Sequence, residues 1–266
     1  MTGQTVRQSC VSLTADGDVA RVTLARPEAN NAINRAIVHG LAAALDELQA
    51  MAPRAVLLSA DGDHFTVGGD LQHLAAEVDR LADDLGEIVP VYHDVLSRLA
   101  GLDVPVVCAA QGVVAGGGLG LVWCSDVVIA ATSLRLATGF AGLGLSGDGG
   151  SSWYLPRLVG PRRARQLMLQ GQRLGSEQAL AWGLVDEVVE PDRLQTVAGQ
   201  RATELAAGPT AAYAQIKHLL RASDQNTLAE QLEAERAAMV DCAGSDDARE
   251  GILSFAERRR PEFRGR

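Results

Sequence analysis

The stretch Val113-Val114-Ala115-Gly116-Gly117-Gly118-Leu119-Gly120-Leu121 joins a strand-like run, Val104–Ala110, to a short apolar run that ends at Trp123. Three consecutive glycines leave the backbone uncovered, so a ligand can approach the peptide N–H groups closely. If a helix begins at Leu119, these N–H groups lie at its N-terminus, where the helix dipole favours negative charge. The stretch could therefore hold a phosphate, a carboxylate or a carbonyl oxygen that gains charge during a reaction. For an isolated glycine triplet, the alternative is a tight turn that only packs against a neighbour.

The composition indicates a globular protein with a sizeable core. The chain has 266 residues, of which 47% are hydrophobic and 21% are charged. These values are ordinary for one large domain, or for one domain with a helical appendage. The formal net charge of -9 at pH 7 opposes binding to nucleic acid or to an anionic membrane surface. We therefore expect neither partner.

The cysteines Cys10, Cys108, Cys124 and Cys242 lie far apart and form no CxxC motif. No pair of His, Cys or carboxylate side chains has the spacing of a metal site, so neither a metal nor a disulfide framework is expected. Met1–Gln8 lack the apolar core of a signal peptide, and no apolar run is long enough to cross a bilayer. We expect a cytoplasmic protein.

Short apolar runs alternate with helix-like segments, which indicates an α/β core. Asn30 or Asn31 is expected to cap a helix whose apolar face begins at Ile33. Pro90 is expected in the first turn of another helix, after a charged segment, residues 72–89, that suggests a mobile cover. The predicted strands are Val19–Leu24, Arg54–Ser59, Val104–Ala110, Asp126–Ala130 and Val185–Val189, and the chain from about Asp192 is predicted to be mainly helical.

A second glycine loop, which contains Gly68-Gly69-Asp70, follows the strand predicted at Arg54–Ser59. Loops at the carboxyl ends of parallel strands are where α/β folds bind ligands. N–H groups from the two glycine loops could converge on one oxygen and stabilise an enolate or a tetrahedral oxyanion. Neither loop has the lysine of a P-loop or the spacing of a dinucleotide motif, so phosphate binding has little support.

Asp148 is the only charged residue between Arg135 and Arg157, and glycines surround it. Such a carboxylate either accepts hydrogen bonds from turn amides or has a perturbed pKa that suits proton transfer or nucleophilic attack. Three histidines are near these segments, and most histidines in such surroundings are surface residues. His64, His73 and His93 are interpreted in this way from their neighbours alone.

The order and spacing of several segments resemble the crotonase superfamily, also called the enoyl-CoA hydratase/isomerase family. The resemblance implies a crotonase-like superhelix of ββα turns over residues 1–200 and a C-terminal helical trimerisation region over residues 201–266. It also implies an acyl-CoA substrate, with no cofactor beyond the coenzyme A of that substrate, and a homotrimer or a hexamer of two trimers. The matching segments are Leu24–Asn34, Phe65–Leu71, Ala115–Gly118, Ser125-Asp126, Leu155–Gly160, Ala179–Val185 and Phe255–Arg259 followed by Pro261.

The same resemblance implies roles for individual residues. The oxyanion hole of the family maps to the N–H groups of Gly69 and Gly117, which would polarise the thioester carbonyl. Arg26 maps near the entrance for coenzyme A, and three residues of the second glycine loop map beside its adenine. The implied substrate contacts are Arg26, Val67, Asp70, Leu71, Gly116 and Phe140.

This sequence departs from the hydratases of the family at both catalytic glutamates. These glutamates map to Gly120 and Phe140, which cannot transfer a proton. Asp148 lies where phenylacetate-pathway enoyl-CoA isomerases, dienoyl-CoA isomerases and the 4-chlorobenzoyl-CoA dehalogenase keep an aspartate. In the dehalogenase branch a histidine and an aromatic residue also line the site, and they match His93 and Phe140.

The preferred hypothesis is an enoyl-CoA isomerase in which Asp148 moves a proton between the α and γ carbons. One alternative makes Asp148 a nucleophile on an acyl- or aryl-CoA, with His93 activating the water that releases the adduct. The other alternative is an acyl-CoA binder without catalytic activity. Hydration by a pair of glutamates is not expected.

Overall fold

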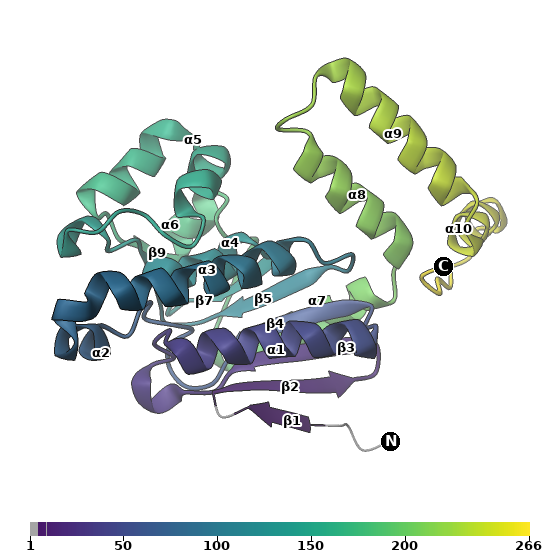
Figure 1. The fold of residues 1–266 in the computed structure, drawn as a ribbon. Helices are drawn as coiled ribbons and strands as arrows, with labels where there is room; N and C mark the ends of the chain where they lie inside the picture. Colours follow the sequence, from purple (N-terminus) through teal and green to yellow (C-terminus); the bar gives the residue numbers. More distant parts are fainter. Residues whose placement is uncertain (1–4, 9) are drawn as a thin grey trace.

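The structure is a computed structural model that describes residues 5–8 and 10–266, so the expectation for the N-terminus falls partly outside the described residues. Its strands form two sheets (Figure 1). They are β1 Thr5–Gln8, β2 Val11–Asp16, β3 Val19–Leu24, β4 Ala55–Ala60, β5 Val106–Ala110, β6 Val113–Ala115, β7 Val127–Ala131, β8 Arg135–Ala137, β9 Leu174–Gly175 and β10 Glu187–Val189. The predicted strands are confirmed, with boundaries shifted by at most two residues.

The larger sheet has the order β1-β2-β3-β4-β5-β7-β10 and the smaller one β6-β8-β9. The larger sheet is antiparallel from β1 to β3 and parallel from β3 onward. The helices are α1 Arg35–Met51, α2 Leu71–Ala76, α3 Leu81–Ala100, α4 Leu119–Trp123, α5 Ser151–Gln170, α6 Ser176–Ala181, α7 Leu194–Ala206, α8 Thr210–Ala222, α9 Leu228–Ala243 and α10 Asp246–Glu257. Short 3-10 helices include η3 Gly116–Gly118 and η5 Pro191–Arg193.

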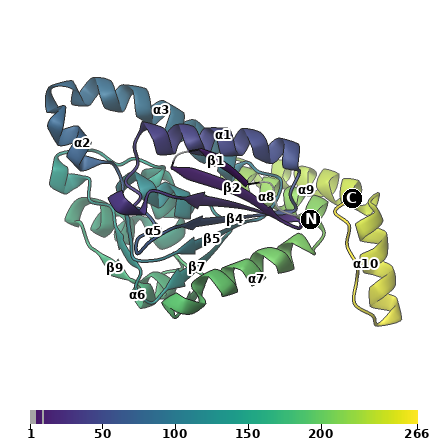
Figure 2. The ribbon, with the colours of Figure 1, turned by 90° about the horizontal axis from the view of Figure 1, so that it is seen from below.

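Helices cover both faces of the large sheet (Figure 2). Val56 and Leu58 of β4 belong to the core on the side of α1 and α3, whereas Leu57 belongs to the core under α7. Burial on both faces explains why the strand reads as an unbroken apolar run. Cys108 of β5 and Cys124 are buried core residues.

The cap of α1 differs from the expectation. The side chain of Asn34, not of Asn30 or Asn31, accepts the hydrogen bond from Ile37 N–H. Asn30 and Asn31 instead adopt left-handed backbone conformations, with φ of 51° and 53°, which asparagine tolerates better than most residues. The Asn31 amide donates to the backbone carbonyls of residues 61 and 64. Asn31 therefore ties the loop before α1 to the second glycine loop instead of capping α1.

The start of α3 was also predicted wrongly. The helix begins at Leu81, and Pro90 lies inside it rather than in its first turn. A proline within a helix removes one hydrogen bond and crowds the carbonyl of the residue four positions earlier. Here that residue is Gly86, whose backbone is freer to adjust than that of other residues. Much of segment 72–89 is exposed, and its mobility stays a prediction.

The helices α8, α9 and α10 form an arm that projects from the sheet domain (Figure 1). The predicted boundary between residues 200 and 201 lies inside α7, which packs on the large sheet; the division into two domains stays a prediction. Lys217 of α8, the only lysine of the chain, joins the arm to the core through Asp126 at 2.6 Å. None of the helices in the described part of the chain combines the length and the hydropathy of a membrane span.

Candidate active site

The second glycine loop is held in place by strand-like bonds to the loop before α1. Ile33 N–H donates to the Gly68 carbonyl at 2.7 Å, and Asp70 N–H donates to the Ile33 carbonyl at 3.0 Å. In this parallel bridge Ile33 faces Gly69. Because Ile33 bonds to the residues on either side of Gly69, the N–H group of Gly69 points away from it. The geometry therefore leaves this N–H group unused on the Ile33 side.

The two glycine loops are in contact. Thr66 pairs with Val114 of β6 in a second parallel bridge. Gly68 has a φ of +85°, and a Cβ at this position would lie 2.7 Å from the carbonyl oxygen of Ala115 and 3.5 Å from the Cα of Gly116. Only glycine allows both this conformation and this approach. The structure thus brings together the two loops that the sequence pairs only by analogy with other α/β folds.

Gly117 lies at the start of a helix, as the sequence predicts. Residues 116–118 form η3, which continues directly into α4. The N–H groups in the first turn of a helix have no partner within the helix. The Gly117 N–H group is therefore available for a ligand, and it lies on the loop that contacts Gly68.

Helix α3 carries two side chains to the first glycine loop and its surroundings. The hydroxyl of Tyr92 donates to the Gly117 carbonyl at 2.9 Å. His93, the next residue, reaches Asp148, where its Nε2 lies 2.6 Å from Oδ1. Since an ionised carboxylate only accepts hydrogen bonds, the imidazole is the donor. His93 is thus a partly exposed surface residue, as its neighbours indicate, with 52% of its side chain exposed, and it also contacts the aspartate of the candidate site.

The second oxygen of Asp148 faces Gly117. A Cβ on Gly117 would lie 2.8 Å from Oδ2 of Asp148, so a carboxylate oxygen occupies the space that any side chain at residue 117 would need. Gly149, with a φ of +61°, packs its Cα side against the Gly117 carbonyl. One oxygen of the carboxylate is thus held by His93, and the other lies beside the glycine loop.

The two positions that match the hydratase glutamates have different surroundings. A Cβ on Gly120 would lie 2.5 Å from the Gly149 carbonyl oxygen and 2.7 Å from Cδ1 of Leu96. Helix α4 therefore packs too closely for any side chain at residue 120. Phe140 is buried, and its ring approaches Gly116. The carboxylate of Asp148, by contrast, contacts the glycine loop at Gly117.

Arg26 and Asp70, both predicted to contact the substrate, contact each other. Arg26 Nη1 donates to Oδ2 of Asp70 at 2.8 Å and to the carbonyl of Ala32 at 3.0 Å. Asp70 also caps α2 by accepting from His73 N–H. Burial alone would raise the pKa of Asp70, but the hydrogen bonds from Arg26 and from His73 N–H outweigh it and hold the pKa below its ordinary value. Leu71 beside them is half exposed.

Two residues were misjudged or missed in the sequence. His64 is half-buried, and its Nδ1 accepts a hydrogen bond from Val113 N–H at 3.2 Å, so it is not a surface residue; His73 is exposed as expected. Tyr92 was not singled out from the sequence. It is buried on α3 together with Val95, Leu96 and Leu99, and the spacing of four residues between Tyr92 and Leu96 was the available signal.

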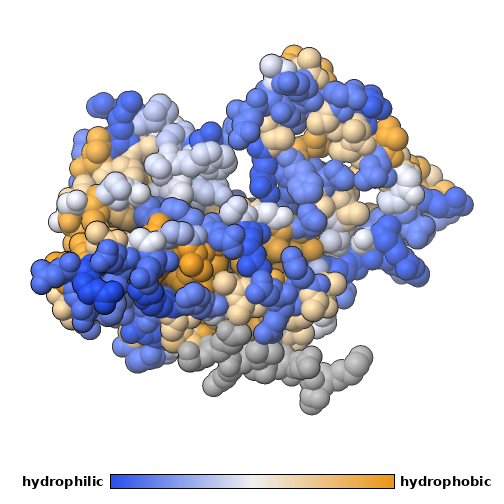
Figure 3. All heavy atoms as spheres, in the orientation of Figure 1, coloured by the Kyte–Doolittle hydropathy of each residue, from blue (hydrophilic) through white to orange (hydrophobic). Residues whose placement is uncertain are grey.

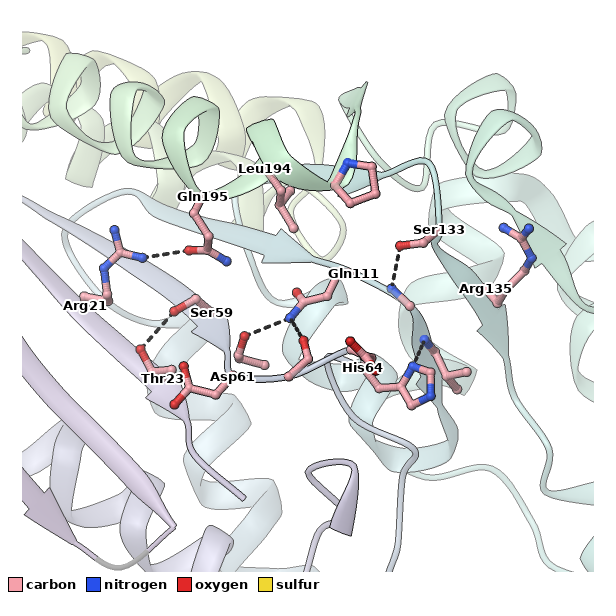
Figure 4. Close-up of a pocket in the computed structure, with 16 residues that line it drawn as sticks. Arg21, Thr23, Ser59, Asp61, His64, Gln111, Ser133, Arg135, Leu194 and Gln195 are labelled. Carbon is pink, nitrogen blue, oxygen red and sulfur yellow. Dashed lines mark hydrogen bonds between the residues drawn. The ribbon is translucent and has the colours of Figure 1, made fainter. Parts of the chain in front are cut away.

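A cleft of about 790 Å³ lies between the large sheet and the N-terminus of α7 (Figure 4). Its walls carry side chains of both signs of charge, the positive Arg21 and Arg135 and the negative Asp61 and Asp63. None of the predicted site residues lines it. This cleft is therefore not the candidate active site, which lies at Gly117 and Asp148. In residues 5–8 and 10–266, no cluster of His, Cys, Asp or Glu could hold a metal ion.

Comparisons with known proteins agree with this architecture. The family model described as enoyl-CoA hydratase/isomerase matches residues 14–266. A 1,2-epoxyphenylacetyl-CoA isomerase from Escherichia coli is 38% identical over 250 residues, which cover 93% of this chain and 95% of the relative. A carnitinyl-CoA dehydratase from the same species is 31% identical over 262 residues, which cover 96% and 98%.

Solved structures show the same fold. The crystal structure of an enoyl-CoA hydratase from Polaromonas sp. JS666 superposes with a TM-score of 0.90 at 30% sequence identity. The match covers 96% of this chain and 99% of that one. The crotonase-like α/β fold and its C-terminal helices are therefore confirmed.

Proposed function

This chain belongs to the enoyl-CoA hydratase/isomerase family, and on that premise we propose that it shifts a carbon–carbon double bond in an enoyl-CoA thioester. The observation that carries the proposal is Asp148, whose carboxylate lies beside Gly117 while Gly120 and Phe140 replace both glutamates of a hydratase. One carboxylate suffices for a proton shuttle, whereas the hydration that the family resemblance describes needs two acid–base groups. The relative that is named an isomerase supports the same choice.

The proposed mechanism begins with the thioester carbonyl oxygen bound by the N–H groups of Gly69 and Gly117. Oδ2 of Asp148 removes a proton from the α or γ carbon, and the electron pair of the broken C–H bond moves through the conjugated system onto the thioester oxygen. The two N–H groups stabilise this enolate. Asp148 then returns the proton to the other carbon, so that the double bond moves and no water is added.

Deuterium exchange tests this proposal. The protein would be incubated in D2O with a panel of short, medium and aryl-substituted enoyl-CoA esters, and the products would be analysed by mass spectrometry. Incorporation of deuterium at the α or γ carbon is the expected result. Binding of the esters without any label would contradict the proposal and would favour the non-catalytic binder; a mass increase of one water would favour a hydratase.

A second candidate function uses Asp148 as a nucleophile: its carboxylate would bond to the acyl carbon of an acyl-CoA, with the thiolate of coenzyme A leaving, or to a ring carbon of a halogenated aryl-CoA, with halide leaving. The hydrogen bond of 2.6 Å between His93 and Asp148 favours it, because a histidine beside the nucleophile could activate the water that releases the adduct. In the isomerase this histidine would only orient the carboxylate.

Replacement of His93 by alanine separates the two candidates. For the isomerase we expect the rate of double-bond shift to fall by no more than about tenfold, since Asp148 still carries the proton. For the nucleophilic mechanism we expect nearly complete loss of turnover and a covalent adduct on Asp148, detected as added mass on the intact protein. His39→Ala, at an exposed histidine of α1, is the matched control and should leave the rate unchanged.

We also propose that the chain forms a homotrimer, or a hexamer of two trimers, through its C-terminal arm. Hydrophobic side chains are exposed along this arm, and the surface is hollowed between it and α5 (Figure 3). Apolar residues exposed together on helices mark an interaction site. Light scattering would give the mass in solution. The exposed residues of the arm include Leu220, Leu228, Met239, Ile252 and Phe255.

The remaining expectations rest on the family and stay proposals. Coenzyme A would enter near Arg26, its adenine would lie beside Val67, Asp70 and Leu71, and no further cofactor is proposed. The pairing of Arg26 with Asp70 leaves the other nitrogens of the guanidinium for a phosphate of coenzyme A. We propose the cytoplasm as the location of the reaction.

A further inference from the structure

Tyr92 is buried within the apolar face of α3, and only 2% of its surface is exposed. Its hydroxyl nevertheless has a partner, the carbonyl of Gly117 at 2.9 Å. Burial, and after it electrostatic repulsion from Cys124 and Asp148, raises the pKa of Tyr92 well above its ordinary value. The raised pKa keeps the hydroxyl protonated, so it remains a hydrogen-bond donor throughout the working pH range.

The Gly117 carbonyl is confined on two sides. Tyr92 donates to it from α3, and the backbone of Gly149 packs against it from the turn that carries Asp148. A Cβ on Gly117 would also lie 3.6 Å from Cε1 of Tyr92, so the aromatic ring borders the same residue. A glycine has the greatest backbone freedom of all residues. Holding its carbonyl fixes the peptide plane between Gly117 and Gly118, so the Gly117 N–H group can turn only through the two dihedral angles of Gly117.

The contacts of α3 connect the two halves of the proposed mechanism. His93 holds Oδ1 of Asp148, and the preceding residue, Tyr92, holds Gly117. Both side chains extend from one turn of a helix whose next turn places Leu96 against Gly120. A shift of the glycine loop relative to this helix would alter the distance between the base and the bound thioester.

We propose that Tyr92 is a positioning residue, which directs the Gly117 N–H group at the thioester oxygen through its hydrogen bond to the Gly117 carbonyl. This inference rests on the proposed function, because it needs an acyl-CoA carbonyl bound at Gly117. Tyr92 itself touches no reacting atom. Its effect is on alignment, and small errors in the alignment of catalytic groups cost large factors in rate.

The test is Tyr92→Phe, which removes the hydroxyl and keeps the ring that fills the core. Butyryl-CoA and octanoyl-CoA carrying 13C at the thioester carbonyl serve as saturated, unreactive probes, and difference infrared spectroscopy reads their C=O frequency when bound. In the wild type we expect a shift to lower frequency, because donors on the oxygen weaken the C=O bond. In Tyr92→Phe we expect a smaller shift.

Kinetics give a second readout. With the enoyl-CoA ester that the wild type isomerises, kcat of Tyr92→Phe should fall by about 10- to 100-fold, while KM should change little because the contacts to coenzyme A lie elsewhere. Tyr213→Phe, which removes a hydroxyl from α8, is the matched control and should leave the carbonyl frequency and kcat unchanged. Thermal unfolding would show whether each variant is folded.

The outcomes test the positioning role of Tyr92 separately from the proposed isomerase activity. If Tyr92→Phe lowers only the unfolding temperature and leaves the frequency and kcat as they are, Tyr92 is a packing residue and the inference is wrong. If the wild type does not shift the frequency of either probe, Gly117 does not bind the thioester oxygen and the inference is wrong as well. If the shift depends on Tyr92 but no ester is isomerised, the inference stands and the proposed isomerase fails.

Discussion

Replacement of Asp148 by asparagine is expected to reduce the rate of double-bond isomerisation by about 10³- to 10⁴-fold, the upper part of the range for general acid–base catalysis. Asparagine has the same shape, so its side-chain oxygen can still accept the hydrogen bond that His93 now donates to Oδ1. The amide cannot, however, take up a proton at neutral pH. The measurement is kcat with the best enoyl-CoA ester, together with deuterium incorporation in D2O.

The control for this variant is binding. The affinity for a saturated acyl-CoA should change by less than a few-fold, because Asp148 is not one of the residues proposed to contact coenzyme A. Asp94→Asn, on the exposed side of α3 next to His93, should retain full activity. If Asp148→Asn still exchanged deuterium at the wild-type rate, another base would have to be sought.

Gly120→Glu is the second variant with a large expected effect, and it tests whether a hydratase can be restored at this site. The new Cβ would lie 2.5 Å from the carbonyl oxygen of Gly149 and 2.7 Å from Cδ1 of Leu96. The carbonyl belongs to the backbone beside Asp148, so it cannot move without displacing the carboxylate. We expect isomerisation to fall by at least about 100-fold and the free energy of unfolding by about 1–3 kcal/mol.

The same packing predicts that Gly120→Glu combined with Phe140→Glu gains no hydratase activity, although it restores both residue types. Gly142→Glu is the matched control, because a Cβ at Gly142 meets no atom within 4 Å and this glycine is exposed. That variant should be as stable as the wild type. Chemical unfolding would measure the stability of each variant, and assays with 2-enoyl-CoA esters would measure hydration. Measurable hydration by the double variant would refute the packing argument.

Much of the fold was predictable because its elements are buried in a way that leaves a pattern. The strands β4 and β5 have helices on both faces, and they appear in the sequence as unbroken apolar runs. The glycine triplet indicated the strand-to-helix turn at η3. The predictions of the α1 cap and of the α3 start were wrong because tertiary contacts overrode the local sequence signal. An asparagine before a helix predicts a cap, but Asn31 is used to tie two loops together, and a proline predicts a helix start, but Pro90 lies within α3.

The sequence by itself determined the α/β class, the family, the two glycine loops and the presence of a lone aspartate, Asp148, in a chain that has Gly120 and Phe140 at the positions of the hydratase glutamates. Each of these depends on residues near one another in the chain or on their order along it. Only the tertiary structure decided that His93 meets Asp148, that Arg26 pairs with Asp70, that Tyr92 holds Gly117 and that residue 120 has no space for a side chain. These contacts join segments 25 to 55 positions apart or depend on distances of a few tenths of an ångström. No local pattern encodes them, because they arise when α3, the two glycine loops and the turn before α5 pack together.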